Sequence, residues 1–272
     1  MAGHWTLNDI PWEKFEPTKV DPEILAAVKA ASLVEGTAED YVSYLSQVFE
    51  GDAKTIALFE EWGAEELQHG RALARWAQLA DPSFDFEGAV KAFKAGYRPE
   101  HFDTGVPRRG TRQGEMVSRC IVEVGTSSYY SAMKEFAAEP VLKEIAARIA
   151  ADEFKHYKLF FETLHQQSGK PEPVWRRLMV ALGRASEAED DELGYAYYCG
   201  NTPLSEIGRA PYDRKASIDA YRRPIALMFR KHHVKKAAQM IAKAVGLSPQ
   251  GWLVRAGAWF IWQRMHADAR AA

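Results

Sequence analysis

The chain has 272 residues and is 47% hydrophobic, which is enough for a substantial core and excludes a disordered composition. Its formal net charge is −2, and its two cysteines, Cys120 and Cys199, form no CxxC pair, so we expect no disulfide framework, zinc ribbon or rubredoxin-type iron site. The first residues lack the pattern of a secretory signal, and no run of about 18 apolar residues occurs, so we expect a cytoplasmic protein without a transmembrane segment.

Apolar residues recur at intervals of three and four, which is the spacing of amphipathic helices. The pattern predicts a first helix that follows Asp21 as N-cap, with Pro22 as its first residue, and continues to about Phe49. A second helix is predicted from about Asp52 to Leu79, and a long loop rich in Gly, Pro and Arg follows it.

The second half of the predicted bundle begins after this loop. A third helix is predicted from about Gly114 to Ala138, and a fourth from the break at Pro140 to about Gln167. Further helices are predicted at residues 174–200, 217–245 and 251–269. Four long helices followed by smaller ones predict an all-α fold, with a four-helix bundle and its lead segment at residues 1–168 and a C-terminal helical extension packed on it at residues 169–272.

The four long helices resemble two copies of one hairpin. The segment LVEGTAEDYVSYL in the first helix is similar to IVEVGTSSYYSAM in the third, and Glu35 precedes Glu66 by 31 residues as Glu123 precedes Glu153 by 30. Glu66 and Glu153 each begin a Glu-x-x-His motif. An internal repeat of this kind predicts a pseudo-twofold axis, with the two motifs facing each other across the bundle.

Each of these four glutamates lies in the apolar stripe of its helix, and two of the stripes also carry a histidine, His69 and His156. Burying an ionised carboxylate without a partner costs several kcal/mol, and four carboxylates in one core also repel one another. Two divalent metal ions would balance the four charges, and two neutral imidazoles would complete the ligand shells. One Glu from each of two helices with a Glu-x-x-His from each of two others is the arrangement of carboxylate-bridged dimetal bundles.

The donor set indicates which metal to expect. Oxygen donors dominate, with one nitrogen per metal, which favours iron or manganese over zinc. We expect two iron ions, with manganese as the second choice. Glu39, one turn from Glu35, is an alternative first-helix ligand. A third match, Glu162 to His165, lies nine residues after the second motif and is predicted to be a solvated pair on the opposite helix face.

The segments WGAEELQHGRAL and IAADEFKHYKLFFETL resemble the ferritin-like di-iron carboxylate superfamily, and within it the soluble acyl-carrier-protein desaturases, over roughly residues 20–167. The resemblance implies a ferritin-like four-helix bundle. It implies that Asp152 orients a ligand histidine across the bundle. It also implies that Trp62 lies on an electron path and Thr126 beside the oxygen-binding side, although an ordinary core tryptophan and a hydroxyl bonded to its own helix are the alternatives. The ligands that it implies are Glu35, Glu66, His69, Glu123, Glu153 and His156.

This resemblance implies an oxygen-activating di-iron oxidoreductase that oxidises an unactivated C–H bond, as an acyl-chain desaturase or hydroxylase. Electrons would come from a ferredoxin or a separate reductase, because no GxGxxG fingerprint is present. A rubrerythrin- or ferritin-like ferroxidase or peroxidase is the alternative, and a non-enzymatic helical scaffold is the third reading. A homodimer is expected.

Charge is distributed unevenly along the chain. From Arg209 to the end there are 13 Lys and Arg against 3 Asp, a net charge of +10, which leaves 22 basic and 34 acidic residues, a net charge of −12, in the first 208. The first interpretation of the basic C-terminal region is that its aromatic residues pack on the bundle while its basic residues stay solvated. Docking of an acidic acyl carrier and binding to an anionic membrane are the two alternatives. No nucleic-acid partner is expected.

Overall fold

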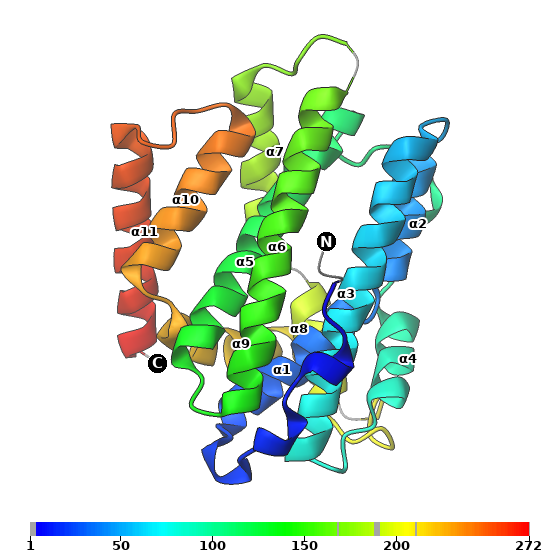
Figure 1. Cartoon of the computed structure of the whole chain (residues 1–272), viewed down its shortest axis with the longest axis vertical. Coiled ribbons are helices and arrows are strands. Elements are labelled where there is room, and N and C mark those ends of the chain that lie inside the picture. The colour runs from blue at the N-terminus through cyan, green and yellow to red at the C-terminus, as the bar shows by residue number, and fades with distance from the viewer. Residues whose placement is uncertain (1–3, 168, 188–190, 210, 272) are drawn as a thin grey trace.

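The computed structural model describes residues 4–167, 169–187, 191–209 and 211–271, and within these ranges the regular structure is helical, with no β-strand (Figure 1). The all-α prediction is therefore confirmed. The helices, in chain order, are α1 (Pro22–Glu35), α2 (Ala38–Val48), α3 (Ala53–Ala80), α4 (Phe86–Gly96), α5 (Arg112–Phe136), α6 (Pro140–Gln166), α7 (Val174–Glu187), α8 (Asp191–Asn201), α9 (Arg214–Met228), α10 (Lys231–Val245) and α11 (Trp252–Ala271).

Acidic side chains begin three of the long helices. Asp21 accepts hydrogen bonds from the first backbone N–H groups of α1, Asp52 accepts from the N–H of Thr55 in α3, and Glu139 accepts from the N–H of Leu142 in α6. These bonds satisfy donors that have no partner within the helix. The helix starts that the sequence predicts at Asp21, Asp52 and Pro140 are confirmed to within a residue or two.

The prediction of one helix from Asp21 to Phe49 is wrong, because the chain bends between α1 and α2. At this point α1 and α3 approach so closely that a Cβ atom on Gly70 would lie 2.7 Å from the backbone nitrogen of Gly36. The bend at Gly36 and Thr37 is thus coupled to a close packing contact that the local sequence does not reveal. As a result, α1 ends at Glu35, beside the Glu-x-x-His segment of α3.

Two other helix predictions need correction, and a third lies partly outside the described residues. Helix α4 was not expected; Asp85 caps it, and it buries Ala89 and Phe93. The predicted helix at 217–245 is divided into α9 and α10, because His233 accepts a hydrogen bond from the backbone N–H of Arg230 and starts a new helix there. The predicted helix at 174–200 is described as α7 and α8, and the middle of that prediction, residues 188–190, lies outside the described residues.

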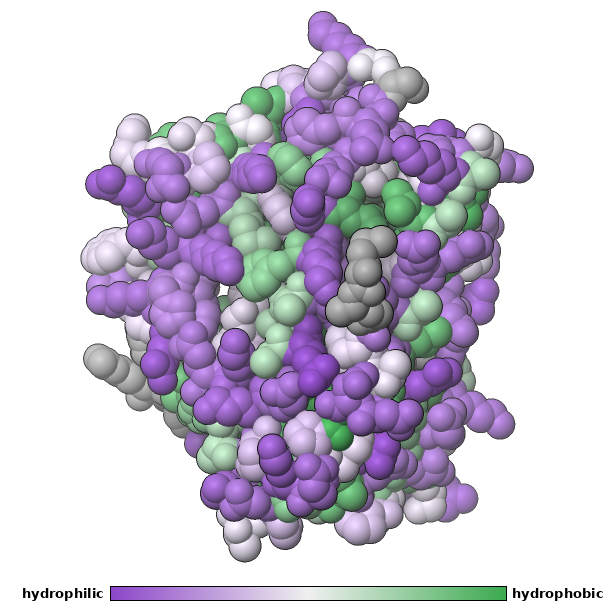
Figure 2. Space-filling model, viewed as in Figure 1, coloured by the Kyte–Doolittle hydropathy of each residue, from purple (hydrophilic) through white to green (hydrophobic). Residues whose placement is uncertain are grey.

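Helices α3, α5, α6 and α1 form the centre of the fold. Helix α5 packs along α6, α3 packs against α1 and α6, and α8 and α10 cover α1 and α5 respectively. The N-terminal segment, dark blue in Figure 1, crosses the face formed by α3 and α6. The surface in this view is mostly hydrophilic, with smaller groups of hydrophobic residues (Figure 2). Among the described helices, none combines the length and the apolarity that crossing a membrane requires.

The apolar core consists of two clusters, and the polar motifs lie between them. Along α3, Trp62 belongs to one cluster and Leu73 to the other, with the Glu-x-x-His motif in between. Along α6 the order is reversed, with Ile149 before the motif and Phe160 after it. The carboxylates and imidazoles therefore form a buried polar layer that crosses the core.

Candidate metal centre

Four helices bring the six sequence-predicted ligands together. They form two overlapping groups, and within each group the ligand atoms lie within 4.8 Å of one another. One group contains Glu35 and His69, and the other contains Glu123 and His156, while Glu66 and Glu153 belong to both. All six side chains are buried, with no more than 8% of any residue exposed. Two ions could thus each have their own Glu and His and share two carboxylates.

Both histidines direct Nδ1 into the cluster. Nδ1 of His69 lies 3.4 Å from a carboxylate oxygen of Glu66 and 3.4 Å from one of Glu153. Nδ1 of His156 lies 3.2 Å from Glu66 and 3.8 Å from Glu123. The shared glutamates thus lie between the two imidazoles, in the position that a bridging ligand occupies.

Several buried polar atoms of the cluster have no hydrogen-bond partner. These atoms are Nδ1 of His69, Nδ1 of His156, Oε2 of Glu123 and Oε1 of Glu153. An unsatisfied buried polar group costs about 1–3 kcal/mol, so four in one place require an explanation. Nitrogen and oxygen donors that converge without partners fit a pair of metal ions with carboxylate and imidazole ligands.

Burial and neighbouring charges shift the pKa values of the four carboxyl groups. Burial, with the nearby charge of Glu66, raises the pKa of Glu35 well above its usual range, and burial with the charge of Glu153 does the same for Glu123. Burial also acts on Glu66 and Glu153, but there the nearby histidines outweigh it and lower the pKa. The pKa values of the four carboxyl groups are therefore shifted in opposite directions, upward for Glu35 and Glu123 and downward for Glu66 and Glu153.

The carboxylates around the two imidazoles shift the histidine pKa values upward. Burial lowers the pKa of His69 and His156, but the surrounding carboxylates outweigh burial and raise the pKa of both well above the usual value. A metal ligand must be deprotonated. Metal binding at this centre would therefore displace protons from both histidines and from Glu35 and Glu123.

Each histidine is oriented by an acid on the opposite helix. Asp152 accepts at 3.2 Å from Nε2 of His69, in agreement with the role that the resemblance implies. Nε2 of His156 lies 2.8 Å from Oε2 of Glu65, a residue that sequence reasoning missed. The internal repeat contained the signal, because Glu65 precedes its Glu-x-x-His motif as Asp152 precedes the other.

The N-terminal segment contributes a further residue that sequence reasoning missed. Nε1 of Trp5 donates to Oδ2 of Asp152 at 2.5 Å, and the Trp5 ring stacks on His69 with 5.9 Å between centroids. Gln68 donates to the backbone carbonyl of Trp5 at 2.7 Å and fixes the segment on α3. His4 also contacts Asp152, at 3.0 Å.

Thr126 and Trp62 lie on the other side of the centre. Oγ1 of Thr126 lies 2.5 Å from Oε2 of Glu153, and 3.3 Å from two backbone carbonyls of its own helix. Trp62 is buried against Phe160, and its Nε1 atom has no hydrogen-bond partner. Trp62 therefore has core contacts, while the hydrogen-bonded connection to a ligand histidine runs through Trp5.

Two alternatives from the sequence lie outside the cluster. Glu39 is exposed on α2, because the bend after Glu35 turns it away. Glu162 and His165 are exposed as predicted, and Nδ1 of His165 lies 2.8 Å from the carbonyl of Phe161. Among the described residues, none of Glu39, Glu162 and His165 belongs to a group of converging ligand atoms.

Two further side chains hold the terminal carboxylates. The Tyr130 hydroxyl donates to Oε1 of Glu35 at 2.6 Å, and Nη2 of Arg119 donates to Oε1 of Glu123 at 3.0 Å. Neither residue was selected from the sequence as a contact of the centre. The two halves of the centre thus differ, with a neutral donor on one terminal carboxylate and a cation on the other.

A cavity of about 370 Å³ adjoins the centre, a size typical of small-molecule sites. Thr126 and three of the candidate ligands, Glu35, Glu66 and Glu123, lie in its wall. Much of the remaining wall is apolar and includes residues of both predicted regions, such as Val34, Ile121, Leu193, Ile225 and Phe229. An apolar molecule in this cavity would lie directly beside the carboxylate cluster.

Comparison with known proteins returned no relative: no family model matches this chain, and no curated protein sequence matches it.

Proposed function

We propose that this protein is a ferritin-like dimetal oxidoreductase that oxidises an unactivated C–H bond of an acyl-type substrate, as a desaturase or hydroxylase. The observation that carries the proposal is the pair of overlapping ligand groups sharing Glu66 and Glu153, placed in the wall of a largely apolar cavity. The oxygen-rich donor set, with one imidazole per ion, favours iron, with manganese as the second choice.

Bound iron would supply the redox chemistry and the activation of O₂, and the protein would position the substrate and exclude water. The residues around the centre are suited to that task. Tyr130 and Arg119 fix the carboxylates of Glu35 and Glu123, and the Thr126 hydroxyl donates to Oε2 of Glu153 with 2.5 Å between the two oxygens. This hydroxyl therefore lies in the cavity wall and contacts a shared candidate ligand.

External electrons would enter through the N-terminal segment. Trp5 is partly exposed, bonds Asp152, and stacks on His69, so it connects the surface to a ligand through two hydrogen-bonded steps. Trp62, the residue that the resemblance implied, has no such connection to a histidine ligand among the contacts described. A ferredoxin or reductase docking near Trp5 is therefore part of the proposal.

The basic C-terminal region is the proposed docking surface for an acidic acyl carrier. Lys235 and Lys236 are both exposed on α10, but Nζ of Lys236 also lies 3.7 Å from the centre of the Phe154 ring. Charge reversal at Lys231 and Lys235 should therefore weaken carrier binding without disturbing α6. A cytoplasmic homodimer completes the proposal.

The deciding experiment is reconstitution with Fe(II) under anaerobic conditions, followed by oxygen consumption with acyl thioesters and free fatty acids. We expect about two iron ions per chain and oxygen uptake that requires both an acyl substrate and an electron donor. Glu66→Ala should abolish both iron binding and oxygen uptake. Rapid turnover of hydrogen peroxide with no response to any acyl substrate would replace the proposal with a peroxidase function.

A further inference from the structure

Helix α11 presents large apolar side chains to solvent. Five of them are between 49% and 72% exposed: Trp252, Leu253, Trp259, Phe260 and Ile261. The side of the helix that includes the buried Ala258 packs on α9 and α10 (Figure 1). The interpretation that the aromatic residues of this region pack on the bundle is therefore wrong for Trp252, Trp259 and Phe260. A helix that is apolar on its outer side as well as its packed side is expected to have a partner on both.

Four of the exposed residues form two rows along α11. Trp252 and Trp259 are seven residues apart, and so are Leu253 and Phe260, so the members of each pair lie on one side of the helix about two turns apart. The rows are neighbours, because consecutive residues of a helix are rotated by about 100°. These four residues, the α11 strip, form one apolar surface with tryptophan along one edge.

The segment that contains the α11 strip is strongly basic. Residues 229–267 contain seven Lys and Arg and no Asp or Glu. All seven are exposed: Arg230, Lys231, Lys235, Lys236, Lys243, Arg255 and Arg264. Glu135 of α5 offsets part of this charge at the start of α10, where it lies 3.8 Å from Arg230 and 2.9 Å from His232. Apolar and cationic side chains are thus exposed together on α10 and α11.

The charge selects among the partners that could cover the α11 strip. In a twofold dimer the same surface of each copy meets the other, so the basic residues of two chains would face each other and repel. An acidic carrier protein would pair with the lysines of α10 without requiring four large apolar side chains in water. An anionic lipid surface accommodates both features, because its phosphates attract Lys and Arg and its headgroup layer is where indole rings lie.

We propose that α11 is an interfacial helix that holds this protein on an anionic lipid surface. The α11 strip enters the boundary between headgroups and acyl chains, and the basic residues of α10 and α11 contact the lipid phosphates. This inference goes beyond the proposed function, because it concerns an outer surface of the molecule and does not depend on the metal centre.

The test is co-sedimentation of the full-length protein with vesicles of two compositions, phosphatidylcholine alone and an equal mixture of phosphatidylcholine and phosphatidylglycerol. We expect binding to the mixed vesicles to be at least about 10-fold tighter than to the neutral ones, and to weaken as salt rises, because salt screens exposed charges. Equal binding to the two compositions, or no binding to either, overturns the proposal.

A double substitution tests the α11 strip itself. Trp259→Ala combined with Phe260→Ala should weaken binding to the mixed vesicles by about 10- to 100-fold, because two large apolar side chains no longer enter the interface. Unchanged binding overturns the proposal. Circular dichroism and iron content check the fold of the variant. If the double variant does not fold, the lipid and salt dependence of the unsubstituted protein still decides.

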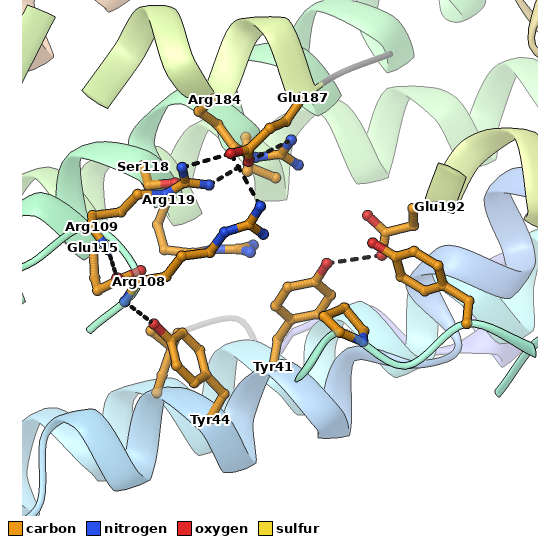
Figure 3. A pocket seen from close by; sticks show the side chains of 14 residues that line it. Tyr41, Tyr44, Arg108, Arg109, Glu115, Ser118, Arg119, Arg184, Glu187 and Glu192 are labelled. Atoms are coloured by element: carbon orange, nitrogen blue, oxygen red, sulfur yellow. Dashed lines mark hydrogen bonds and ion pairs between the residues drawn. The ribbon is translucent and has the colours of Figure 1, made fainter. Parts of the chain in front are cut away.

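Trp175→Ala on α7 is the matched control, since Trp175 is 67% exposed and Trp259 is 61% exposed. The segment around Trp175 is not basic, because residues 169–192 contain four Lys and Arg against six Asp and Glu. One of these acids, Glu187, bonds Arg109 in the pocket that Figure 3 shows. We expect Trp175→Ala to bind mixed vesicles as the unsubstituted protein does. A loss equal to that of the double variant would mean that exposed tryptophan in general, and not α11, causes the binding.

The other two partners give different results. If the protein binds neither vesicle and the double substitution converts a dimer into a monomer in analytical ultracentrifugation, a second copy covers the α11 strip. If it binds neither vesicle and the double substitution weakens binding of an acidic carrier protein, the carrier covers the strip. Failure of the proposed function would instead remove iron binding and oxygen uptake and leave lipid binding intact.

Discussion

Nε2 of His156 lies 2.8 Å from Oε2 of Glu65, on the helix that carries the other Glu-x-x-His motif. The same relationship joins His69 to Asp152 in the opposite direction. Each motif therefore supplies a ligand to the centre and an orienting acid to the histidine across from it. Two helices that exchange contacts in this way fix both imidazoles with Nδ1 directed inward.

We expect Glu65→Gln and Asp152→Asn to weaken metal binding by about 10- to 100-fold each, the usual effect of removing an acid behind a ligand histidine. Competition titrations with a chromophoric chelator measure the affinity. Glu61→Gln is the matched control, since Glu61 is exposed one turn earlier on α3. Unchanged affinity in both orienting variants would contradict the assignment of these acids.

Substituting a glutamate that belongs to both ligand groups should remove more metal than substituting one that belongs to a single group. We expect Glu66→Ala to lose both ions and Glu35→Ala to lose one, because only Glu66 belongs to both ligand groups. His165→Ala should keep the full metal content, since His165 is exposed. Elemental analysis of the three purified variants gives the answer, and equal losses in Glu66→Ala and Glu35→Ala would contradict a bridged pair.

Metal binding should release protons, because the pKa values of Glu35, Glu123, His69 and His156 are all raised and a metal ligand must be deprotonated. Calorimetric titrations in buffers of different ionisation enthalpy count the released protons. Metal binding without release of protons would contradict the raised pKa values of these four groups.

The same shifts predict how stability depends on pH after chelation. A group whose pKa is raised in the folded state binds its proton more tightly there than in the unfolded chain. Its contribution to the free energy of unfolding is therefore complete below its ordinary pKa and is lost as pH rises. The stabilising contributions of Glu35 and Glu123 begin to be lost above pH 4.5, and those of the two histidines above pH 6.5. The Tm of chelated protein should therefore fall between about pH 5 and 8, whereas added metal should stabilise more as pH rises. A rising Tm in chelated protein would contradict this.

The same substitution, Trp to Phe, compares the contributions of Trp5 and Trp62 to electron transfer. We expect Trp5→Phe to slow reduction of the metal-loaded protein by an external donor by about 10- to 100-fold, because it removes the bond to Asp152 behind a ligand histidine. Trp62→Phe should have a much smaller effect. Stopped-flow absorbance follows the reduction, with metal content measured for both variants. A larger slowing of reduction in Trp62→Phe than in Trp5→Phe would instead favour Trp62 as the residue on the electron path.

The ligand set could be read from the sequence because helical periodicity fixes which side chains share a face. Glu66 and His69 occur within the apolar stripe of α3, and the repeat extends the pattern to α6, so the sequence alone predicts six convergent side chains. The local signals of Asp21, Asp52 and Pro140 likewise set the helix starts, since a cap acts within a few residues.

Other features depend on contacts between segments far apart in the chain. The bend at Gly36 lies where Gly70 of α3 approaches the backbone, and Glu35 and Glu39 lie on opposite sides of that bend. Trp5 reaches Asp152 across 147 residues, and Arg119 meets Arg184 only where α5 and α7 border the same cavity. The sequence by itself determined the all-helical class and the inward carboxylates and imidazoles, because these depend on periodicity within one helix. Only the tertiary structure decided which acid orients which histidine, where the N-terminal segment lies and how polar the cavity is, because those depend on the packing of helices against one another.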